Sequence, residues 1–232
     1  TGVNDIVMDP RDPNVIYAST HQRRRHVYTY VGGGPGSGLY KTTDGGSSWN
    51  KINKGLPKVE LGRIGLSISP ADPEVIYAIV EASERKGGFY KSTNRGASWE
   101  KQSSRVTSGN YYQEIVADPV DVNTVYSMDT WMHVTHDGGK TFKNVGEDFK
   151  HVDNHSIWIN PKNNKHWLVG SDGGIYETFD AAKNWDFKEN LPVTQFYKVA
   201  VDNDEPFYNI YGGTQDNFSL GGPSRVNTGH GI

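Results

Sequence analysis

The stretch Thr42-Thr43-Asp44-Gly45-Gly46-Ser47-Ser48-Trp49 decides the interpretation of the whole chain. It places a hydroxyl residue before an acid, a glycine two residues after the acid and an aromatic residue five after it. Three similar stretches begin at Ser92, Thr135 and Thr178. The Asp or Asn can accept backbone N–H bonds inside a tight turn, and the glycine can supply a positive φ. Each stretch therefore predicts a hairpin turn whose aromatic residue begins the returning strand.

The four stretches recur at a regular interval. Their final aromatics, Trp49, Trp99, Phe142 and Trp185, are spaced 43 to 50 residues apart. That interval matches the period of a propeller blade or of another repeat array. The fourth copy has Ala181-Ala182 in place of the glycines. A structural turn tolerates such drift better than a catalytic site does.

A second repeat precedes each of these turns. A proline turn lies between two strand-like segments at Asp9-Pro10, Ser69-Pro70, Asp118-Pro119 and Asn160-Pro161. A fifth copy at Asp202-Asn203 keeps the spacing but moves its proline to Pro206. Proline closes the first hairpin and the β-branched and aromatic residues after it favour a strand. Each unit is therefore predicted to be a four-stranded meander, which is one propeller blade.

The predicted fold class is all-β, a β-propeller of four-stranded antiparallel blades. The predicted blades span approximately residues 1–60, 61–108, 109–150, 151–193 and 194–232, and the fifth is incomplete. Four and a half blades cannot close a ring, and a propeller closes to remove its sheet edges. We expect the chain to be a fragment or a processed product, with the remaining blades supplied by missing sequence or by another chain.

The four turn stretches resemble the Asp-box, or BNR, repeat of sialidases, xyloglucanase-type glycoside hydrolases, sortilin-type receptors and some photosystem assembly factors. All of these are β-propellers. Residues 170–176 and 211–224 also resemble bacterial exported propellers described as glycosyl-hydrolase-like or sortilin-like. The resemblance implies the propeller fold and a secreted or periplasmic location. It also implies that the box acids form turns away from the active centre.

Composition excludes several classes of function. The net charge is −3, and the 24 basic and 27 acidic residues are interspersed, so nucleic acid is not an expected partner. The sequence has no apolar run of the 18 or more residues that a membrane-spanning helix needs. There are no cysteines, which excludes disulfides and thiolate chemistry. We expect no cofactor.

Alternate connections of an antiparallel meander share a face. The proline turns and box turns therefore lie on one face, and the longer loops between second and third strands lie on the other, with the connections between blades. We place function on this second face, because binding residues concentrate on variable loops held by a rigid scaffold. The first blade carries about 15 extra residues there, comprising His21–Tyr30 and a glycine-rich tail, residues 32–38, predicted to be a flexible hinge.

Carboxylates, amides and aromatic rings around one opening can hydrogen-bond and stack sugars. Two carboxylates there could act as acid and base on a glycosidic bond. The catalytic candidates are Asp153, Asp172 and Asp216, with Asp129 and Glu114 behind them. The predicted substrate-binding residues are His21, Arg23, Arg25, Tyr111, Tyr112, Asp129, Trp131, His155, Gln215 and Asn217. Each candidate acid could instead be a loop cap.

Two local motifs have alternative interpretations. His151, Asp153 and His155 would share a face as metal ligands only in a fully extended strand, so no metal site is predicted. The Arg23–Arg25 run could bind a carboxylate-bearing sugar or a phosphate, or could be a solvated loop. The arginine set and Tyr/Glu pair of sialidases find no match here, and neither do the catalytic aspartates of xyloglucanases.

The sequence supports two hypotheses of function. The first is an exported glycoside-hydrolase-like propeller that binds a glycan on the loop face, and whether it also hydrolyses that glycan stays open. The second is a non-enzymatic, sortilin-like scaffold that holds a peptide or a partner protein. In the second case the same aromatics would be anchors, and the acids would be hydrogen-bond acceptors.

Overall fold

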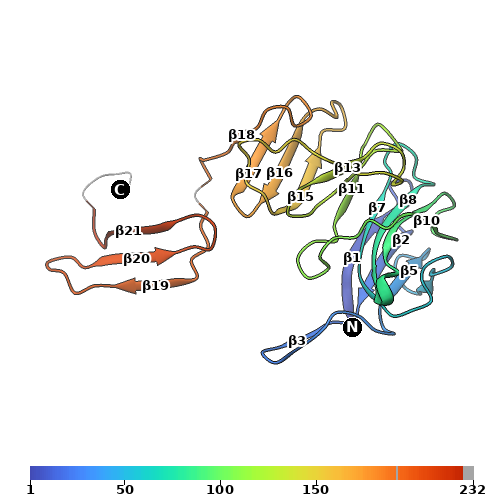
Figure 1. Cartoon of the computed structure of the whole chain (residues 1–232), viewed down its shortest axis with the longest axis horizontal. Helices are drawn as coiled ribbons and strands as arrows, with labels where there is room; N and C mark the ends of the chain where they lie inside the picture. Colours follow the sequence, from blue (N-terminus) through green and yellow to red (C-terminus); the bar gives the residue numbers. More distant parts are fainter. Residues whose placement is uncertain (192, 227–232) are drawn as a thin grey trace. The chain divides into compact units, whose positions relative to one another are not determined.

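The computed structural model describes residues 1–191 and 193–226. The chain divides into two compact units, Thr1–Phe187 and Lys188–Ile232 (Figure 1). The end of the predicted fifth blade, residues 227–232, lies outside the described residues. Among the described residues, no helix is long and apolar enough to cross a membrane.

The first unit contains four four-stranded sheets, each built from strands that are consecutive along the chain and antiparallel, except for an inserted hairpin in the first. The first two sheets comprise β1 (Gly2–Met8), β2 (Ile16–His21), β5 (Gly38–Thr42) and β6 (Asn50–Lys51), then β7 (Leu61–Ile68), β8 (Ile76–Ala82), β9 (Gly88–Ser92) and β10 (Glu100–Ser103). The next two comprise β11 (Ile115–Ala117), β12 (Val125–Ser127), β13 (His133–Thr135) and β14 (Lys143–Asn144), then β15 (Asn154–Ile159), β16 (Trp167–Ser171), β17 (Gly174–Thr178) and β18 (Asp186–Phe187). The predicted all-β class and four-stranded meander are confirmed.

Three smaller elements complete the fold. The insertion in the first sheet forms a separate hairpin, β3 (Arg24–His26) and β4 (Thr29–Val31), and a 3-10 turn η1 (Ser83–Arg85) follows β8. The second unit is a three-stranded sheet of β19 (Lys198–Val201), β20 (Asn209–Gly213) and β21 (Ser219–Pro223). With β21 as its third strand, this sheet exceeds the half blade that the sequence analysis expected.

Each box stretch forms the same hydrogen-bonded turn, which we call a box turn. In the third, the hydroxyl of Thr135 donates to Asp137 Oδ1 at 2.8 Å and accepts the backbone N–H of Gly139 at 2.9 Å. Asp137 in turn accepts the backbone N–H and the hydroxyl of Thr141 at 2.9 and 2.6 Å. Thr135 is buried, so its oxygen satisfies a backbone donor that water cannot reach.

The other three box turns repeat this arrangement with different side chains. Asn94 replaces the acid in the second, where its Nδ2 donates to Ser98 Oγ at 2.8 Å. Ala181 and Ala182 keep positive φ values of 58° and 68° in the fourth, although neither is glycine. The turn is therefore specified by its hydroxyl and acceptor side chains more than by glycine. Gly139 is an exception, because a Cβ there would lie 2.2 Å from the Phe89 ring.

Each box turn is hydrogen-bonded to the proline turn of its own sheet. The donors Gly45, Arg95, Gly138 and Ala181 give their backbone N–H groups to the carbonyls of Asn14, Glu74, Asn123 and Lys165 at 2.9 to 3.1 Å. Both kinds of turn therefore lie at the same end of each sheet. The loops that follow β2, β8, β12 and β16 lie at the opposite end, as the sequence analysis expected.

The core of the first unit lies between neighbouring sheets. One cluster joins the first and second sheets through Tyr17, Leu39, Ile64 and Ile76, and two similar clusters lie between the second and third and between the third and fourth. Box aromatics reach back to the preceding sheet, since Trp99 Nε1 donates to the carbonyl of Ile52 at 2.9 Å. The side chains of one blade thus complete the core of the previous one.

The first sheet has one uncovered apolar row. Val3, Ile6 and Met8 of β1 are 64%, 60% and 56% exposed, and the box aromatic Trp49 is 39% exposed. The equivalent Trp99 is buried because another sheet precedes it. Completion of the ring by further blades stays a prediction, and this row is a surface that such a blade would cover.

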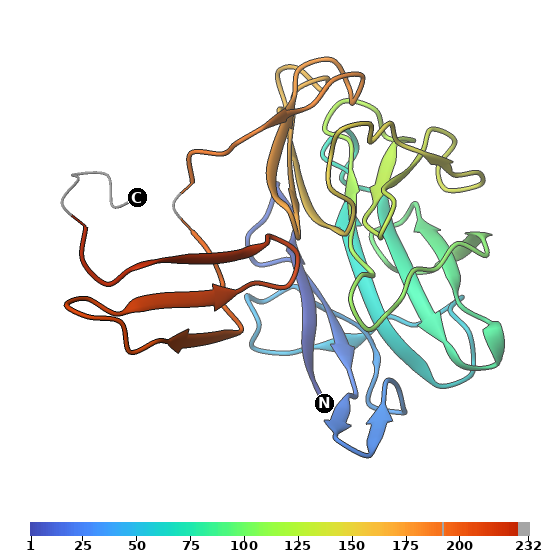
Figure 2. The same ribbon diagram turned by 60° about the vertical axis from the view of Figure 1, so that its left-hand side comes forward.

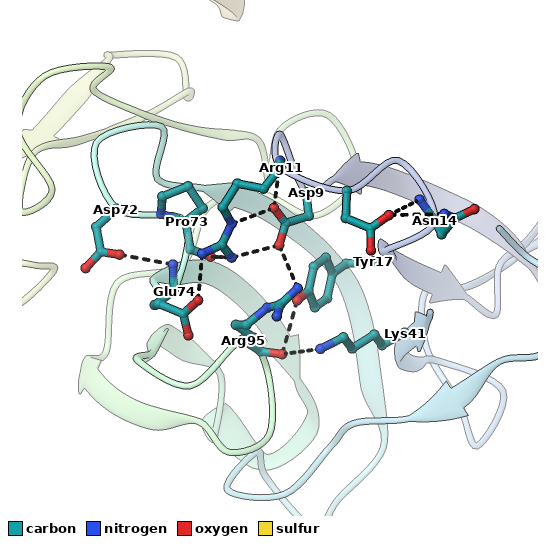
Figure 3. Close-up of polar contacts among 10 residues, drawn as sticks. Asp9, Arg11, Asn14, Tyr17, Lys41, Asp72, Pro73, Glu74 and Arg95 are labelled. Carbon is teal, nitrogen blue, oxygen red and sulfur yellow. Dashed lines mark hydrogen bonds and ion pairs between the residues drawn. The ribbon is translucent and has the colours of Figure 1, made fainter. Parts of the chain in front are cut away.

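A charged cluster ties the turn ends of the first two sheets together (Figure 3). The buried carboxylate of Asp9 pairs with Arg11 at 2.9 Å and with Arg95 at 3.0 Å, and Arg11 also pairs with Glu74 at 2.7 Å. The hydroxyl of Tyr17 donates to the Arg95 carbonyl at 3.2 Å. The hydrogen bonds from Arg11 hold the pKa of Asp9 well below its usual range.

The depressed pKa of Asp9 predicts an acid-sensitive contribution to stability. A carboxylate whose pKa is lower in the folded than in the unfolded state stabilises the fold above about pH 4, and this stabilisation is lost as the pH falls below it. Wild type should therefore exceed Asp9→Asn in free energy of unfolding by about 2 kcal/mol at pH 7. The difference should shrink towards pH 2.5, as measured by urea denaturation.

Asp12→Asn is the matched control, because the hydrogen bonds that the Asp12 carboxylate accepts at 3.0 and 3.2 Å come from the uncharged Asn14. It should lower the free energy of unfolding at pH 7 by less than about 1 kcal/mol. An Asp9→Asn effect that is the same at pH 2.5 and pH 7 would show that the ion pairs do not stabilise the fold.

Candidate functional site

The first strands of the four sheets converge on one cavity. Strands β1, β7, β11 and β15 and their preceding residues line a space of about 300 Å³. Its polar lining consists of Asn4, Asp5, Arg63, Glu114, His155 and Ser156. We call these residues, together with Tyr112, Asp153 and Asp172, the inner-strand site. It lies at the loop end of the sheets, where the sequence analysis placed function.

Register shifts in the sheets aim side chains into this cavity. The pairing of β1 with β2 shifts at Asn4, that of β7 with β8 shifts around Arg63, and that of β15 with β16 shifts at His155. A β-bulge leaves an extra residue unpaired and re-aims its side chain. Three of the four inner strands therefore contribute a bulge residue to the same cavity.

Four side chains of the site are linked in a row. The Tyr112 hydroxyl donates to Asp153 Oδ1, and the Tyr112 ring stacks on His155 with centroids 5.3 Å apart. His155 Nε2 lies 2.9 Å from Asp172 Oδ1. The backbone N–H of Asp172 also donates to the Asp153 carbonyl at 3.2 Å. The predicted residues Tyr112, Asp153, His155 and Asp172 are thus brought together.

Tyr112 is held as a neutral donor. Burial raises the pKa of its phenol to about 12, and the hydrogen bond to Asp153 adds to the rise. Asp153 itself has a φ of 61° and donates its backbone N–H to the Thr130 carbonyl at 2.9 Å. A non-glycine residue in this region is held there by its surroundings. Asp153 is therefore fixed between the Tyr112 hydroxyl and the 129–130 loop.

Glu114 and Asp5 are acids in partly dry surroundings. Burial raises the pKa of Glu114, although Arg63, 3.1 Å away, opposes the rise. Burial also raises the pKa of Asp5, which accepts the backbone N–H of Leu66 at 2.7 Å. A carboxyl group whose pKa is raised can remain protonated and act as an acid. The sequence analysis ranked Glu114 behind the aspartates. Its raised pKa makes it a candidate for a general acid.

A buried lysine supports the loops of the site. Lys150 Nζ donates to Glu147 Oε1 at 2.8 Å, to the His151 carbonyl at 2.8 Å and to Asn154 Oδ1 at 2.5 Å. Asn154 Nδ2 donates onward to the carbonyls of Asp129 and Thr130 at 3.3 and 3.2 Å. The network therefore joins the segment around Asp153 to the loop that carries Asp129.

The remaining candidates of the first unit lie outside this row of linked side chains. Asp129 pairs with Arg105 at 2.8 Å, so it is held by a partner. Tyr111 and Trp131 are 58% and 53% exposed at the loop surface. His21 is buried with its Nε2 3.0 Å from the Gly32 carbonyl, in the first-sheet insertion. Arg23 and Arg25 lie on the inserted hairpin.

The glycine-rich tail of that insertion is held by hydrogen bonds. The backbone N–H of Gly34 donates to the Leu61 carbonyl at 3.0 Å, and that of Gly36 donates to Gln22 Oε1 at 2.9 Å. Ser37 is buried. The segment expected as a hinge is thus tied to the second sheet.

Asp216, Gln215 and Asn217 lie in the second unit. Gln215 Oε1 accepts the Tyr197 hydroxyl, and the backbone N–H of Asn217 donates to Thr214 Oγ1 at 3.0 Å. These residues form a local loop between β20 and β21. Their membership of the site stays a prediction.

No group of three or more His, Cys, Asp or Glu side chains suited to a metal ion occurs within the described part of the chain. The segment His151–His155 is not extended, because Asp153 has a positive φ and β15 begins only at Asn154. His151 Nδ1 lies 2.8 Å from the Val152 carbonyl. The three residues therefore do not share a strand face.

Sequence reasoning missed Asp5, Arg63 and Lys150. Asp5 lies five residues before Pro10, and Glu114 lies five residues before Pro119, so aligning the repeats on their proline turns would have paired these two acids. Arg63 enters the site through a bulge of β7, which such an alignment does not show. Lys150 shows no such signal, since a lysine between blades is usually solvated.

Comparisons with known proteins identify the fold. No protein-family model matches the sequence, and no curated protein matches it. Among solved structures, the GH74 xyloglucanase from Xanthomonas campestris has a TM-score of 0.59 at 16% identity, covering 96% of this chain and 35% of that one. The GH74 enzyme of Niastella koreensis has a TM-score of 0.58 at 19% identity, covering 90% of this chain and 33% of that one.

A third similar structure is of a protein other than a GH74 enzyme. YCF48 from Cyanidioschyzon merolae has a TM-score of 0.51 at 12% identity, covering 96% of this chain and 71% of that one. The chain spans about a third of the length of the two GH74 structures. At these identities the likeness establishes the fold alone, and the chain has a β-propeller fold.

The buried lysine yields a stability prediction. Lys150→Met should lower the free energy of unfolding by about 3–5 kcal/mol, because it leaves the buried Glu147 carboxylate without its cation. The double variant Lys150→Met/Glu147→Gln should recover part of this loss, since no uncompensated charge remains. Urea denaturation of both variants measures the difference.

If the double variant is less stable than Lys150→Met, the uncompensated charge is not the cause of the loss. A Lys150→Met loss below about 1 kcal/mol, the size expected of an exposed ion pair, would contradict the buried network itself.

Proposed function

We propose that the inner-strand site binds a glycan. The observation that supports it best is the set of three bulges that aim Asn4, Arg63 and His155 into one cavity. Amide, guanidinium and imidazole groups hydrogen-bond sugar hydroxyls and ring oxygens. The exposed rings of Tyr111 and Trp131 on nearby loops offer surfaces for stacking. The GH74 structures with the same fold make a glycan the first ligand class to test.

A second candidate function is hydrolysis of that glycan at the same site. It is favoured by the raised pKa of Glu114, which suits a general acid, and by the carboxyl group of Asp172, which lies 2.9 Å from His155 Nε2 in the same row. Hydrolysis needs one protonated and one ionised carboxyl group on either side of the scissile bond. Glu114 would protonate the leaving oxygen and Asp172 would act as base or nucleophile. Asp153 would position Tyr112.

We also propose that the protein is exported to the periplasm or the medium, because its box repeats resemble those of exported bacterial propellers. Cell fractionation of the source organism tests it, with the chain expected outside the cytoplasm.

Glycan-array binding followed by product analysis tests the proposed function. Asp172→Asn and Glu114→Gln should each weaken binding of array glycans, while Glu100→Gln on the outer strand β10 should not. If the site hydrolyses its glycan, both variants should lower the rate by at least about 100-fold. The rate should also fall as the pH rises through the raised pKa of Glu114, because the acid must be protonated.

The outcomes separate the two hypotheses. Binding that is lost in both variants, without any cleavage, would leave a glycan-binding protein and exclude the hydrolase. Binding of peptides but of no glycan on the array would contradict the proposal and favour the sortilin-like alternative.

A further inference from the structure

The inserted hairpin β3–β4 and the residue before it carry three arginines whose charges the fold does not pair. It projects from the end of the first sheet, near Thr1 (Figure 2). No acidic residue occurs between Asp12 and Asp44, a stretch that includes Arg23, Arg24 and Arg25. The hairpin is therefore locally cationic in a chain whose net charge is −3.

These three arginines differ from four other arginines of the first unit. Arg11, Arg63, Arg95 and Arg105 each pair with a carboxylate at 2.7 to 3.1 Å. Within residues 1–191 and 193–226, no ion pair involves Arg23, Arg24 or Arg25. All three side chains are exposed. Their guanidinium groups are available to an external anion.

The register of the hairpin separates the arginines between its two faces. Arg25 is paired with Tyr30, while Arg24 is paired with Val31. Paired residues of two antiparallel strands point to the same face, and neighbours along a strand point to opposite faces. Arg23 lies over the Tyr30 ring, with its Cζ 5.8 Å from the ring centroid. One face therefore presents Arg23, Tyr30 and Arg25, and the other presents Arg24 and Val31.

The Tyr30 ring is held in place on this face. A Cβ on Gly32 would lie 2.8 Å from the ring, so the ring rests against the bare backbone of that glycine. The Gly32 carbonyl is 3.0 Å from His21 Nε2, which anchors the glycine to the buried end of β2. Tyr30 nonetheless remains 43% exposed. The face combines a fixed, accessible aromatic ring with two guanidinium groups.

We propose that the Arg23–Tyr30–Arg25 face binds a carboxylate-bearing polysaccharide. A guanidinium forms paired hydrogen bonds with a carboxylate, and an aromatic ring stacks on the apolar face of a sugar. Two cations beside one ring suit a polymer that carries a single charge on each sugar. Nucleic acid is disfavoured, because its affinity comes from many phosphate contacts and this face offers two cations.

This inference rests on the proposed glycan binding and specifies the charge of the glycan. The hairpin leaves the first sheet at the loop end, the same end as the inner-strand site. It would hold an acidic chain by its carboxylates while a neighbouring part of the chain occupies the inner-strand site. The two sites can be tested separately, because they share no residue.

The experiment measures the Kd of tetragalacturonate by isothermal titration in 50 mM salt. Its fully methyl-esterified form, which carries no charge, is the control ligand. The double variant Arg23→Ser/Arg25→Ser and the single variant Tyr30→Ala should each raise the Kd by at least about tenfold. Arg24→Ser is the matched control on the opposite face and should change the Kd by less than about twofold. All four side chains are exposed, so circular dichroism should show unchanged folding.

Four results would overturn the inference. One is equal binding of the methyl ester, and a second is an Arg24→Ser effect as large as that of the double variant. The third is tighter binding of single-stranded oligo-dT than of tetragalacturonate, which would indicate a nucleic-acid site. Lack of binding to any of these probes would also contradict it.

Failure of the inference is distinguishable from failure of the proposed function. Neutral-glycan binding that depends on Asp172, without any effect of Arg23 and Arg25, would refute the hairpin site and leave the inner-strand site standing. Tetragalacturonate binding that depends on Arg23 and Arg25 but is unchanged by Asp172→Asn and Glu114→Gln would refute the inner-strand site and leave the hairpin site standing.

Discussion

The buried hydroxyl that opens each box turn is the interaction on which the fold depends. Thr42, Ser92, Thr135 and Thr178 each accept the backbone N–H four residues later and donate to the Asp or Asn beside them. These two bonds close the hairpin. A backbone N–H of the closed turn then bonds to the proline turn of the same sheet. The box aromatic follows in the returning strand and packs towards the preceding sheet. Because the same turn recurs in four sheets, the sheets share one geometry and their first strands can converge. The box acids have a structural role, since their oxygens already accept hydrogen bonds from the turn backbone and from a neighbouring hydroxyl or amide.

The opposite end of the sheets is free to vary, and its polar groups are arranged differently. There the inner strands depart from regular pairing, and bulge residues point into a shared cavity. Tyr112, Asp153, His155 and Asp172 form a linked row, while Glu114 sits in partly dry surroundings that raise its pKa. Buried Lys150 holds the supporting loops through its hydrogen bonds to Glu147 and Asn154, and burying its charge costs desolvation free energy. The rigid turn end and the irregular loop end are thus two consequences of one repeated hairpin.

Short sequence patterns predicted those parts of the structure that interactions between residues close in sequence determine. The hydroxyl, acid and aromatic of each box specify a turn within eight residues, so the hairpins and the choice of functional end were predictable. Strand β21 was not, because its Gly221-Gly222-Pro223 ending has low strand propensity and it forms by pairing with β20. Asp5, Arg63 and Lys150 were missed because their roles arise where residues distant in sequence meet. Which face of the β3–β4 hairpin carries Arg25 also depends on the pairing register of its strands, which the sequence of the insertion alone does not fix.

The central claim is that the box turns hold the fold and the loop end carries the function. It is tested most directly by the free energies of unfolding of Thr135→Val and Asp172→Asn, measured side by side in urea. Thr135→Val should lose about 1–3 kcal/mol, because it leaves buried backbone donors unsatisfied. Asp172→Asn should lose less than about 1 kcal/mol, because its pair with His155 is partly exposed, with 41% and 35% of the two side chains accessible. The opposite order, with Asp172→Asn the more damaging change, would contradict the account.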